Sequence, residues 1–237
     1  MEEILESREI VDLVKNYCTT TFAKKLVAEM KFALLVGIAA AGKDSVLKIL
    51  LGDADFAKIV TTITRPPRIG EINGVNYHFI TDEIAKENLL ARKYFEAKIV
   101  HGRVYGTTIN ELAKISRTKK IALADVDVQG VAEYQKFAKN LVAVFLIPPD
   151  FATWQTRWQK RGAISRDEKL RRTESAVREL TDALGKNYYR FVINDDLPRA
   201  ARVCDEIFHG QQKTYKDDFA RTIAEKLRDD IAKSLEK

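Results

Sequence analysis

The chain has 237 residues, of which 46% are hydrophobic and 31% are charged. This composition excludes collagen-like, low-complexity and wholly disordered chains, and the length suits one domain with sub-lobes. Forty Lys and Arg residues against 34 Asp and Glu residues give a formal net charge of +6. This excess favours anionic partners without choosing among nucleic acids, membrane surfaces and nucleotides.

Three further features concern the compartment. The two cysteines, Cys18 and Cys204, form no CxxC motif, so the sequence supports neither a disulfide framework nor a cysteine metal site. The longest apolar runs, residues 32–36 and 141–147, are far shorter than the roughly 20 residues that a membrane span needs. The chain opens with glutamates rather than a basic leader. We therefore expect a cytoplasmic protein that does not engage a membrane.

The apolar pattern changes along the chain. Residues 1–30 have apolar side chains at helical spacing, which predicts an extension of one or two amphipathic helices. Apolar runs of strand length follow at residues 32–36, 59–64, 121–128, 141–147 and 190–193. Helical stretches occur at residues 45–51, 81–90, 151–161 and 166–184. Because strands and helices alternate, we expect an α/β domain over residues 31–210, with a central parallel sheet flanked by helices.

The C-terminal segment, residues 211–237, has an apolar residue at every fourth position. These residues are Phe219, Ile223, Leu227, Ile231 and Leu235. Such spacing predicts one apolar stripe on an amphipathic helix. The stripe could pack on the N-terminal helices, on the core or on a second subunit, so the terminal helices also offer a route to an oligomer.

The first predicted strand leads into a loop with the pattern G-x4-G-K, followed by a helix. In a phosphate loop the glycines permit tight turns, successive backbone N–H groups point into one concavity, and the lysine reaches the terminal phosphates. A plain strand-to-helix turn is the alternative for so short a motif. The candidate residues are Gly37, Ala39, Ala40, Ala41, Gly42, Lys43, Asp44 and Ser45.

Asp44 stands where the phosphate-loop motif has Ser or Thr, whose hydroxyl holds Mg²⁺. A carboxylate about 4 Å from a phosphate charge costs on the order of 4 kcal/mol at an effective dielectric constant of 20. A magnesium ion between the two groups reverses the sign of this interaction. Because magnesium accepts carboxylate oxygens, Asp44 is a candidate for a direct metal ligand.

A second motif is the Arg-Pro-Pro-Arg sequence from Arg65 to Arg68. Proline fixes the backbone angle φ, so this corner can hold two guanidinium groups in place, and guanidinium forks bind phosphate oxygens in a bidentate manner. Tyr77 could add a hydroxyl donor. Read alone, the motif is more often a solvated surface turn.

Further polar segments follow at residues 95–96, 101–107 and 124–130. Together with the loop and the two arginines they resemble the guanylate kinases, which move a phosphoryl group from ATP to GMP. The resemblance extends in order from about residue 32 to residue 208. It implies a P-loop kinase with a nucleotide-monophosphate-binding insert near residues 65–108 and a lid near residues 151–180.

The resemblance also implies a GMP site. Its residues would be Thr61, Arg65, Arg68, Tyr77, Glu96, Tyr105, Thr107, Asp125 and Asp127. Glu96 matches the carboxylate that accepts hydrogen bonds from guanine, which has donors on N1 and N2 where adenine has an acceptor at N1. Asp125 matches the acidic residue near the metal and, with Asp44, completes the metal candidates. Two residues apart in a predicted strand, Asp125 and Asp127 are expected to share one face.

The predicted lid has eight Lys and Arg residues and four Asp and Glu residues. Arg157 and Arg161 are four residues apart and share a helix face, whereas the two tryptophans of this segment are expected to pack in the core. By resemblance, the lid arginines close over the transferring phosphates and Asn194 lies near adenine. The implied catalytic residues are Lys43, Arg157, Arg161 and Arg172, and Arg157 and Asn194 join the ATP site.

The reaction implied by the resemblance is ATP + GMP to ADP + GDP, with dGMP as a second acceptor and Mg²⁺ as the metal. The chain departs from the family where Ala40 replaces an inner glycine and Asp44 replaces the metal-binding hydroxyl. The alternative is therefore a catalytically impaired module that binds GMP or a protein partner. A nucleic-acid binder is a distant third, because the sequence has no basic patch interleaved with aromatic residues.

Overall fold

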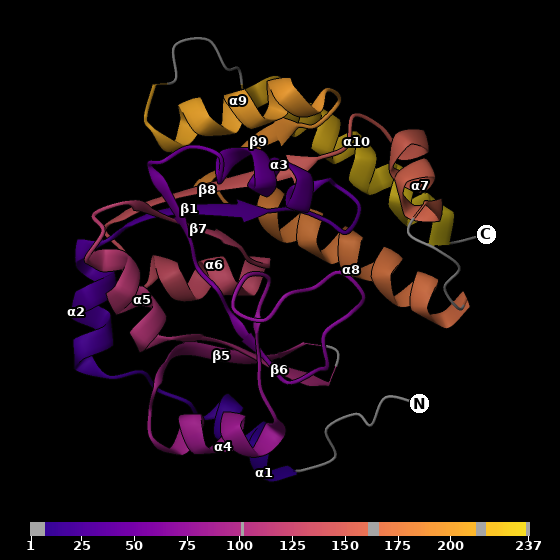
Figure 1. The fold of residues 1–237 in the computed structure, drawn as a ribbon. Helices are drawn as coiled ribbons and strands as arrows, with labels where there is room; N and C mark the ends of the chain where they lie inside the picture. The colour runs from indigo at the N-terminus through magenta and orange to yellow at the C-terminus, as the bar shows by residue number, and fades with distance from the viewer. Residues whose placement is uncertain (1–7, 101, 161–165, 212–216, 236–237) are drawn as a thin grey trace. The chain divides into compact units, whose positions relative to one another are not determined.

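The computed structural model describes residues 8–100, 102–160, 166–211 and 217–235 (Figure 1). In chain order its elements are α1 (Arg8–Lys15), α2 (Thr21–Glu29), β1 (Lys31–Val36), α3 (Lys43–Leu50), β2 (Phe56–Lys58), β3 (Thr62–Ile63), β4 (His78–Phe79), α4 (Asp82–Leu90), β5 (Tyr94–Val100), β6 (Arg103–Thr108), α5 (Ile109–Ser116), β7 (Ile121–Asp125), α6 (Val128–Gln135), β8 (Asn140–Ile147), α7 (Phe151–Gln159), α8 (Arg166–Leu184), β9 (Tyr189–Ile193), α9 (Leu197–Phe208) and α10 (Asp217–Leu235). Among these helices, none combines the length and apolar character that crossing a membrane requires.

Five strands form one sheet in the order β2-β7-β1-β8-β9. The pair β8 and β9 is parallel, with Ala143 opposite Tyr189 and Ile147 opposite Ile193. β1 from Phe32 onward and the second half of β8 are buried, as expected for strands covered on both faces. The structure confirms the predicted α/β fold with a central parallel sheet flanked by helices.

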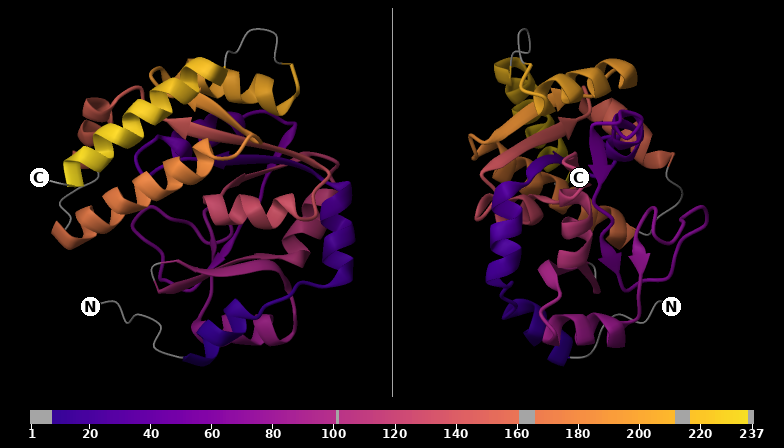
Figure 2. Two further views of the ribbon diagram at one scale, coloured as in Figure 1. Left: turned by 180° about the vertical axis from the view of Figure 1, so that it is seen from behind. Right: turned by 60° about the vertical axis from the view of Figure 1, so that its left-hand side comes forward.

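Contacts divide the chain into two compact units, which are described separately. The first comprises Met1–Lys31, Ala57–Ala124 and Glu133–Asn140, and the second comprises Phe32–Phe56, Asp125–Ala132 and Leu141–Lys237. In the second unit, α3 packs on α9, and α10 packs on α8, α7 and β9. The long helices α8 and α10 lie side by side, which is clearest from behind (Figure 2).

The first unit contains a four-stranded sheet in the order β4-β3-β6-β5. β6 is antiparallel to both β3 and β5, whereas β3 and β4 are parallel. The two N-terminal helices predicted from the sequence are present, and α1 packs on α4 and β5. β4 and β5 are the edge strands of this sheet.

The predicted strand at residues 59–64 differs from the structure. Residues 59–64 were expected to form one strand, but β2 and β3 belong to different sheets and the chain between them is irregular. The N–H of buried Val60 is donated to the side chain of Glu111 at 3.2 Å instead of to a strand. The apolar run is thus buried without being a continuous strand.

The expectation for Asp125 and Asp127 was also wrong. β7 ends at Asp125, and Asp127 precedes α6, where its Oδ1 accepts the N–H of Gly130 at 2.7 Å. Asp127 is therefore a helix cap, a position that aspartate favours, and the two carboxylates do not share a strand face.

The C-terminal helix is present, but its buried stripe is shifted. The buried residues are Ala220, Ala224, Leu227 and Ile231, whereas Phe219 is 63% exposed. Small alanines let α10 approach its neighbours closely in the second unit. Of the three places considered for this helix, the structure thus shows it on the core.

Candidate active site

The loop between β1 and α3 requires glycine at both ends. Gly37 has φ +149°, and a Cβ there would lie 2.3 Å from the carbonyl oxygen of Leu146 in β8. Gly42, the N-cap of α3, has φ +94°, and a Cβ there would lie 2.3 Å from Asn194 Nδ2. Both positions therefore exclude a side chain on steric and conformational grounds.

Ala40 occupies the left-handed region with φ +65° and is buried. A residue with a Cβ pays roughly 1–2 kcal/mol for this conformation. Ala40→Gly is therefore expected to raise the free energy of unfolding by about 1 kcal/mol, as measured by urea denaturation. Ala39→Gly is the matched control and should lower the free energy of unfolding. Ala39 does not have a positive φ, so glycine there relieves no strain and only increases the entropy of the unfolded chain. An Ala40→Gly variant no more stable than the parent would contradict the strain at this position.

Lys43 folds back over the loop. Its Nζ donates to the carbonyl oxygen of Gly37 at 2.5 Å and to that of Ile38 at 3.5 Å. A carboxyl on α8, Glu179, is electrostatically coupled to Lys43, and burial raises the pKa of Glu179 against the opposing effects of Ser175 and Lys43. Lys43 and Glu179 thus form a charged pair in the second unit. Glu179 was not among the residues predicted from the sequence.

Side chains from α7 and the end of β9 hold the outer carbonyl groups of the loop. Trp154 Nε1 donates to the carbonyl of Ala39 at 2.8 Å, and Asn194 Nδ2 donates to that of Ala41 at 2.8 Å. In a trans peptide the following N–H points the opposite way. The N–H groups of Ala40 and Gly42 therefore face away from these two donors, as a phosphate-binding concavity requires.

Arg157 is also at this loop. Its Nη2 donates to the carbonyl of Asn194 at 2.7 Å and its Nη1 to that of Ala41 at 3.4 Å. Burial lowers the pKa of Arg157, although a guanidinium stays protonated at neutral pH. Beside these groups is a pocket of about 350 Å³, lined by Ala40, Gly42, Ser45, Arg157, Asn194, Asp195 and Leu197. Four of the predicted ATP-site residues thus share one pocket with Arg157.

The two metal candidates are exposed carboxylates. Asp44 lies in the first turn of α3, and Asp125 ends β7, whose next residue, Val126, donates its N–H to the carbonyl of Leu35 at 3.1 Å. Asp125 is thus at the end of β1 where the loop begins. Exposed carboxylate oxygens suit magnesium, which keeps several waters and needs only one or two protein ligands. Among the described residues, the three-ligand group is elsewhere, at Asp53, Asp55 and His209.

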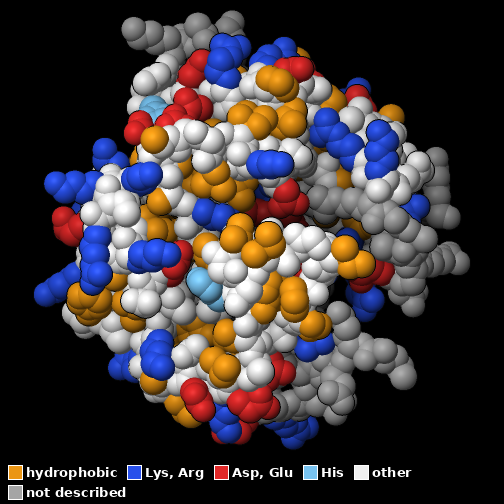
Figure 3. All heavy atoms as spheres, viewed as in Figure 1, with side chains coloured by type: hydrophobic (Ala, Val, Ile, Leu, Met, Phe, Trp, Pro, Cys, Tyr) orange, Lys and Arg blue, Asp and Glu red, His pale blue; other side chains and the backbone are white. Residues whose placement is uncertain are grey.

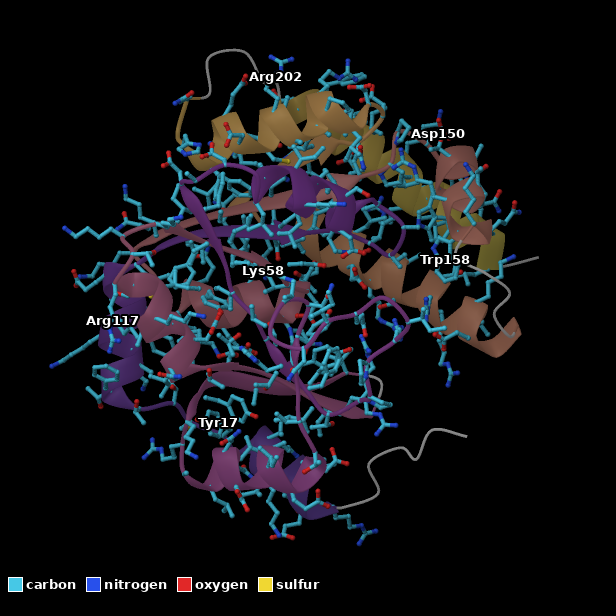
Figure 4. All side chains as sticks on the ribbon, viewed as in Figure 1. Tyr17, Lys58, Arg117, Asp150, Trp158 and Arg202 are labelled. Atoms are coloured by element: carbon cyan, nitrogen blue, oxygen red, sulfur yellow. The ribbon has the colours of Figure 1, made fainter. Side chains whose placement is uncertain are left out.

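Arg172 has a different environment. Its Nε donates to Glu168 at 2.5 Å, and its guanidinium lies 5.5 Å from the ring centroid of Trp158. Figure 4 labels Trp158 on α7 and Asp150 just before it, and Asp150 Oδ1 caps this helix by accepting the N–H of Thr153 at 2.7 Å. The fourth catalytic candidate, Arg161, lies outside the described residues.

In the first unit, Arg65 is buried and already engaged. Its two Nη atoms donate to the two carboxylate oxygens of Glu71 at 2.6 and 2.7 Å. Its guanidinium lies 5.4 Å from the ring of Tyr77 and 5.7 Å from that of Phe79. Tyr77 in turn meets Tyr105 edge to face at 6.2 Å. Arg65, Tyr77 and Tyr105 therefore lie together in one cluster, which Glu71 joins. That this cluster binds the acceptor phosphate stays a prediction.

Arg68, the other arginine of the motif, has an exposed side chain, but its backbone N–H donates to Glu71 Oε2 at 2.7 Å. The loop that contains it is anchored by Lys58 (Figure 4), whose Nζ donates to the carbonyl of Val75 at 2.6 Å. The Arg68 side chain is thus exposed to solvent on a loop that Lys58 and Glu71 anchor.

Glu71 makes stability depend on pH. Its hydrogen bonds with Arg65 lower its pKa from 4.5 to about 2, and the N–H of Arg68 contributes. Between these values the folded protein binds fewer protons than the unfolded chain, so stability is full above pH 4.5 and is lost as the pH falls toward 2. Urea unfolding at pH 5 and pH 3 should show a larger loss in the parent than in Glu71→Gln. Equal losses would contradict the ion pair's contribution.

The predicted base-contacting residues form a buried hydrogen-bonded chain. Glu96 Oε1 accepts from the Thr107 hydroxyl at 2.7 Å and from the Thr107 N–H at 3.2 Å. The Tyr134 hydroxyl lies 3.3 Å from the Thr107 hydroxyl and donates to it. Burial, assisted by the Glu96 charge, raises the pKa of Tyr134, so this phenol keeps its proton. One carboxylate oxygen is thereby fixed by two donors.

The other predicted GMP-site residues are placed less closely. Thr61 precedes β3 and accepts the His78 N–H on its carbonyl at 2.9 Å. Asp125 and Asp127 belong to the second unit. Tyr105, Thr107 and Glu96 share one face of the β5–β6 pair, because alternate residues of a strand face the same way and Glu96 is opposite Thr107.

Besides Glu179, sequence reasoning missed three residues of these clusters. Trp154 was expected only to pack in the core, although a buried indole N–H needs an acceptor. Glu71 follows the Arg-Pro-Pro-Arg corner closely enough to suggest a partner for it. Nothing in the sequence predicted the contact of Tyr134 with Thr107, because the two residues are far apart along the chain.

Comparison with known proteins shows the family of the chain. The guanylate kinase family model matches residues 29–211. The guanylate kinase of Clostridium perfringens is 30% identical over 203 residues, covering 85% of this chain and 93% of that protein. That of Schizosaccharomyces pombe is 31% identical over 194 residues, covering 80% and 96%. A crystal structure of guanylate kinase from Anaplasma phagocytophilum has the same fold, with a TM-score of 0.61, 20% identity and coverage of 80% and 90%. The chain therefore belongs to the guanylate kinase family.

Proposed function

We propose that this protein transfers a phosphoryl group from ATP to GMP, and also to dGMP, giving ADP and the nucleoside diphosphate. The observation that carries the proposal is the Glu96 carboxylate, buried and held by Thr107, because guanine offers N1 and N2 donors to such a group. The relatives named guanylate kinase support the same substrate.

In this proposal the second unit binds ATP. The amides of the loop and the Lys43 ammonium receive the phosphates, and Arg157 and Asn194 line the adjoining pocket. Phosphoryl transfer asks little covalent work of side chains, so catalysis consists of positioning the reactants and neutralising charge. Arg161 and Arg172 are proposed to add positive charge when the lid closes.

The first unit is proposed to bind the acceptor. Arg65, Arg68, Tyr77 and Tyr105 supply guanidinium and hydroxyl donors for the GMP phosphate. Thr61 and Thr107 complete the proposed acceptor set in this unit. Asp125 and Asp127, which the resemblance also assigns to GMP, belong to the second unit, where Asp127 caps α6, and their contact with GMP stays a prediction. Because the Arg65 guanidinium donates both Nη atoms to Glu71, a phosphate that binds Arg65 must replace some of these hydrogen bonds.

Asp44 and Asp125 would hold Mg²⁺, whose chemistry is to neutralise phosphate charge. A carboxylate is a stronger ligand for this ion than a hydroxyl. Asp44→Ser is therefore expected to keep turnover at saturating magnesium but to need several-fold more of the ion for half-maximal rate. A magnesium titration of the two proteins measures this. An unchanged half-saturation point would remove Asp44 from the metal site.

The proposed partners are free nucleotides. In Figure 3, Lys and Arg side chains are spread over the face shown and interleaved with acidic ones, instead of forming one basic stripe. A nucleic-acid interface on this face would favour such a stripe. Because ATP and GMP are metabolites of the cell interior, the proposal keeps the cytoplasmic assignment.

A coupled assay of ADP release tests the function. With ATP and magnesium, turnover is expected mainly with GMP and dGMP among GMP, dGMP, AMP, CMP and UMP. If none of the five nucleotides gives turnover with Mg²⁺ or with Mn²⁺ but calorimetry shows GMP binding, the catalytically impaired module is favoured. Equal turnover of AMP and GMP would contradict the role of Glu96.

A further inference from the structure

The N-terminal segment, residues 8–20, precedes the region matched by the family model and takes no part in the proposed function. In the first unit its apolar side chains join one cluster with α4 and the four-stranded sheet. The cluster comprises Ile10, Leu13, Val14, Tyr17, Ile80, Ala85, Leu89, Tyr94, Ala97, Ile99 and Val104. Figure 4 labels Tyr17 where the segment passes α4 and β5. The segment is thus built into this unit.

Three hydrogen bonds of this segment meet at Tyr94, the first residue of β5, whereas Arg92 donates to the carbonyls of Cys18 and Thr19. The Tyr17 hydroxyl accepts the N–H of Tyr94 at 2.9 Å and donates to the carbonyl of Tyr94 at 2.6 Å. The Thr19 hydroxyl donates to the same carbonyl at 2.9 Å. Since β5 is an edge strand, its outer backbone groups lack a strand partner. Tyr17 and Thr19 supply that partner at a single residue.

Tyr94 is also where the register of β5 changes. Tyr94 pairs with Thr108, but Glu96 pairs with Thr107, so Phe95 is the extra residue of a β-bulge. In a regular strand Tyr94 and Glu96 would share a face. Here a Cβ at Gly106 would lie 2.7 Å from the Tyr94 ring, which places that ring on the Gly106 side of the sheet. Glu96 bonds to Thr107 on the opposite side.

The bulge therefore determines where the Glu96 carboxylate points. A one-residue change of register would turn this side chain toward the apolar cluster, where an ionised carboxylate is costly. The two hydrogen bonds from Tyr17 and the one from Thr19 hold the residue at which that change would begin. Burial raises the pKa of Tyr17, so its hydroxyl keeps the proton that it donates.

We propose that Tyr17 and Thr19 are positioning residues for the guanine site, which hold the β5 bulge in the register that presents Glu96 to the base. This inference rests on the proposed function, since it takes Glu96 as the ligand of guanine. It gives the segment before the family match a task in selecting the acceptor nucleotide.

Tyr17→Phe tests the inference, because it removes the hydroxyl and keeps the ring in the apolar cluster. The KM and the Kd for GMP are expected to rise about threefold to tenfold, the effect of one to two neutral hydrogen bonds. The preference for GMP over AMP should fall by a similar factor. The KM for ATP and kcat should change less than about twofold, because the second unit is untouched. Thr19→Val should act in the same direction.

Glu9→Gln is the matched control. It breaks the 2.7 Å ion pair between Glu9 in α1 and Lys86 in α4 without touching Tyr94. Glu9 is 61% exposed and Lys86 is partly exposed, and ion pairs at the surface add little to stability. This variant should therefore behave like the parent in every measurement.

The outcomes separate the inference from the function. A parent that neither binds nor phosphorylates GMP would overturn both. A parent active on GMP, with unchanged KM and base preference in Tyr17→Phe and in Thr19→Val, would overturn only the inference, even if the melting temperature falls. If Tyr17→Phe does not fold, Thr19→Val decides alone, since it retains the whole tyrosine.

Discussion

Glu96→Gln should raise the KM for GMP about 100-fold or more and remove most of the preference for GMP over AMP. Thr107 fixes one oxygen of this side chain with its N–H and its hydroxyl. In the variant, the side-chain amide oxygen accepts the two hydrogen bonds from Thr107. The amide NH2 group then stands where the second carboxylate oxygen stood, and it cannot accept hydrogen bonds from the N1 and N2 donors of guanine. Two charge-assisted hydrogen bonds of roughly 1.5–3 kcal/mol each are at stake.

The assay is steady-state turnover with GMP and AMP at saturating ATP. Adenine offers an acceptor at N1, so the variant's amide can donate to AMP. Glu133→Gln is the control, because this exposed glutamate pairs only with exposed Lys136 among the contacts described. A Glu96→Gln variant that kept the parent's KM for GMP and its base preference would remove Glu96 from the guanine site.

Lys43→Met should lower kcat about 100-fold to 1000-fold while leaving the KM for GMP nearly unchanged. Methionine matches the length of the lysine stem but has no charge to offer the transferring phosphoryl group. Loss of one preorganised electrostatic group at a reacting centre has effects of this size. The Nζ already points at the loop, where it donates to Gly37 and Ile38. Little rearrangement is therefore needed for it to meet a phosphate.

The matched control is Lys48→Met, an exposed lysine in the same helix α3. It should retain full turnover and comparable stability. Single-turnover measurements on Lys43→Met separate the chemical step from nucleotide binding. A normal single-turnover rate in that variant would contradict the proposed role of Lys43.

The overall fold was predictable because its signals are local. Alternating apolar runs and helical stretches give the α/β class, and the glycines at Gly37 and Gly42 mark a turn that the structure shows to exclude any side chain. The same holds for the terminal helices, whose spacing is helical. The predicted C-terminal stripe was wrong at Phe219, because Ala220 and Ala224, small residues that the pattern did not count, are buried instead.

The arrangement of the site was less predictable, because it depends on contacts between distant residues. Nothing near Tyr134 indicates that its hydroxyl meets Thr107. The run at residues 59–64 reads as a strand, but the N–H of Val60 is satisfied by Glu111. The prediction for Asp127 failed for a local reason, since a helix-capping aspartate and a strand-end aspartate look alike in sequence. The roles of Arg161 and Arg172 in a lid stay predictions.

The hydrogen bonds from Trp154 and Asn194 to carbonyl groups of the phosphate loop affect the entropy of nucleotide binding. A loop that had to become ordered around its ligand would lose roughly 1–2 kcal/mol of backbone entropy for each residue it fixed. Here that loss accompanies folding instead of nucleotide capture. Calorimetric titration with ATP should accordingly show a smaller unfavourable entropy than the same titration of a variant lacking the indole.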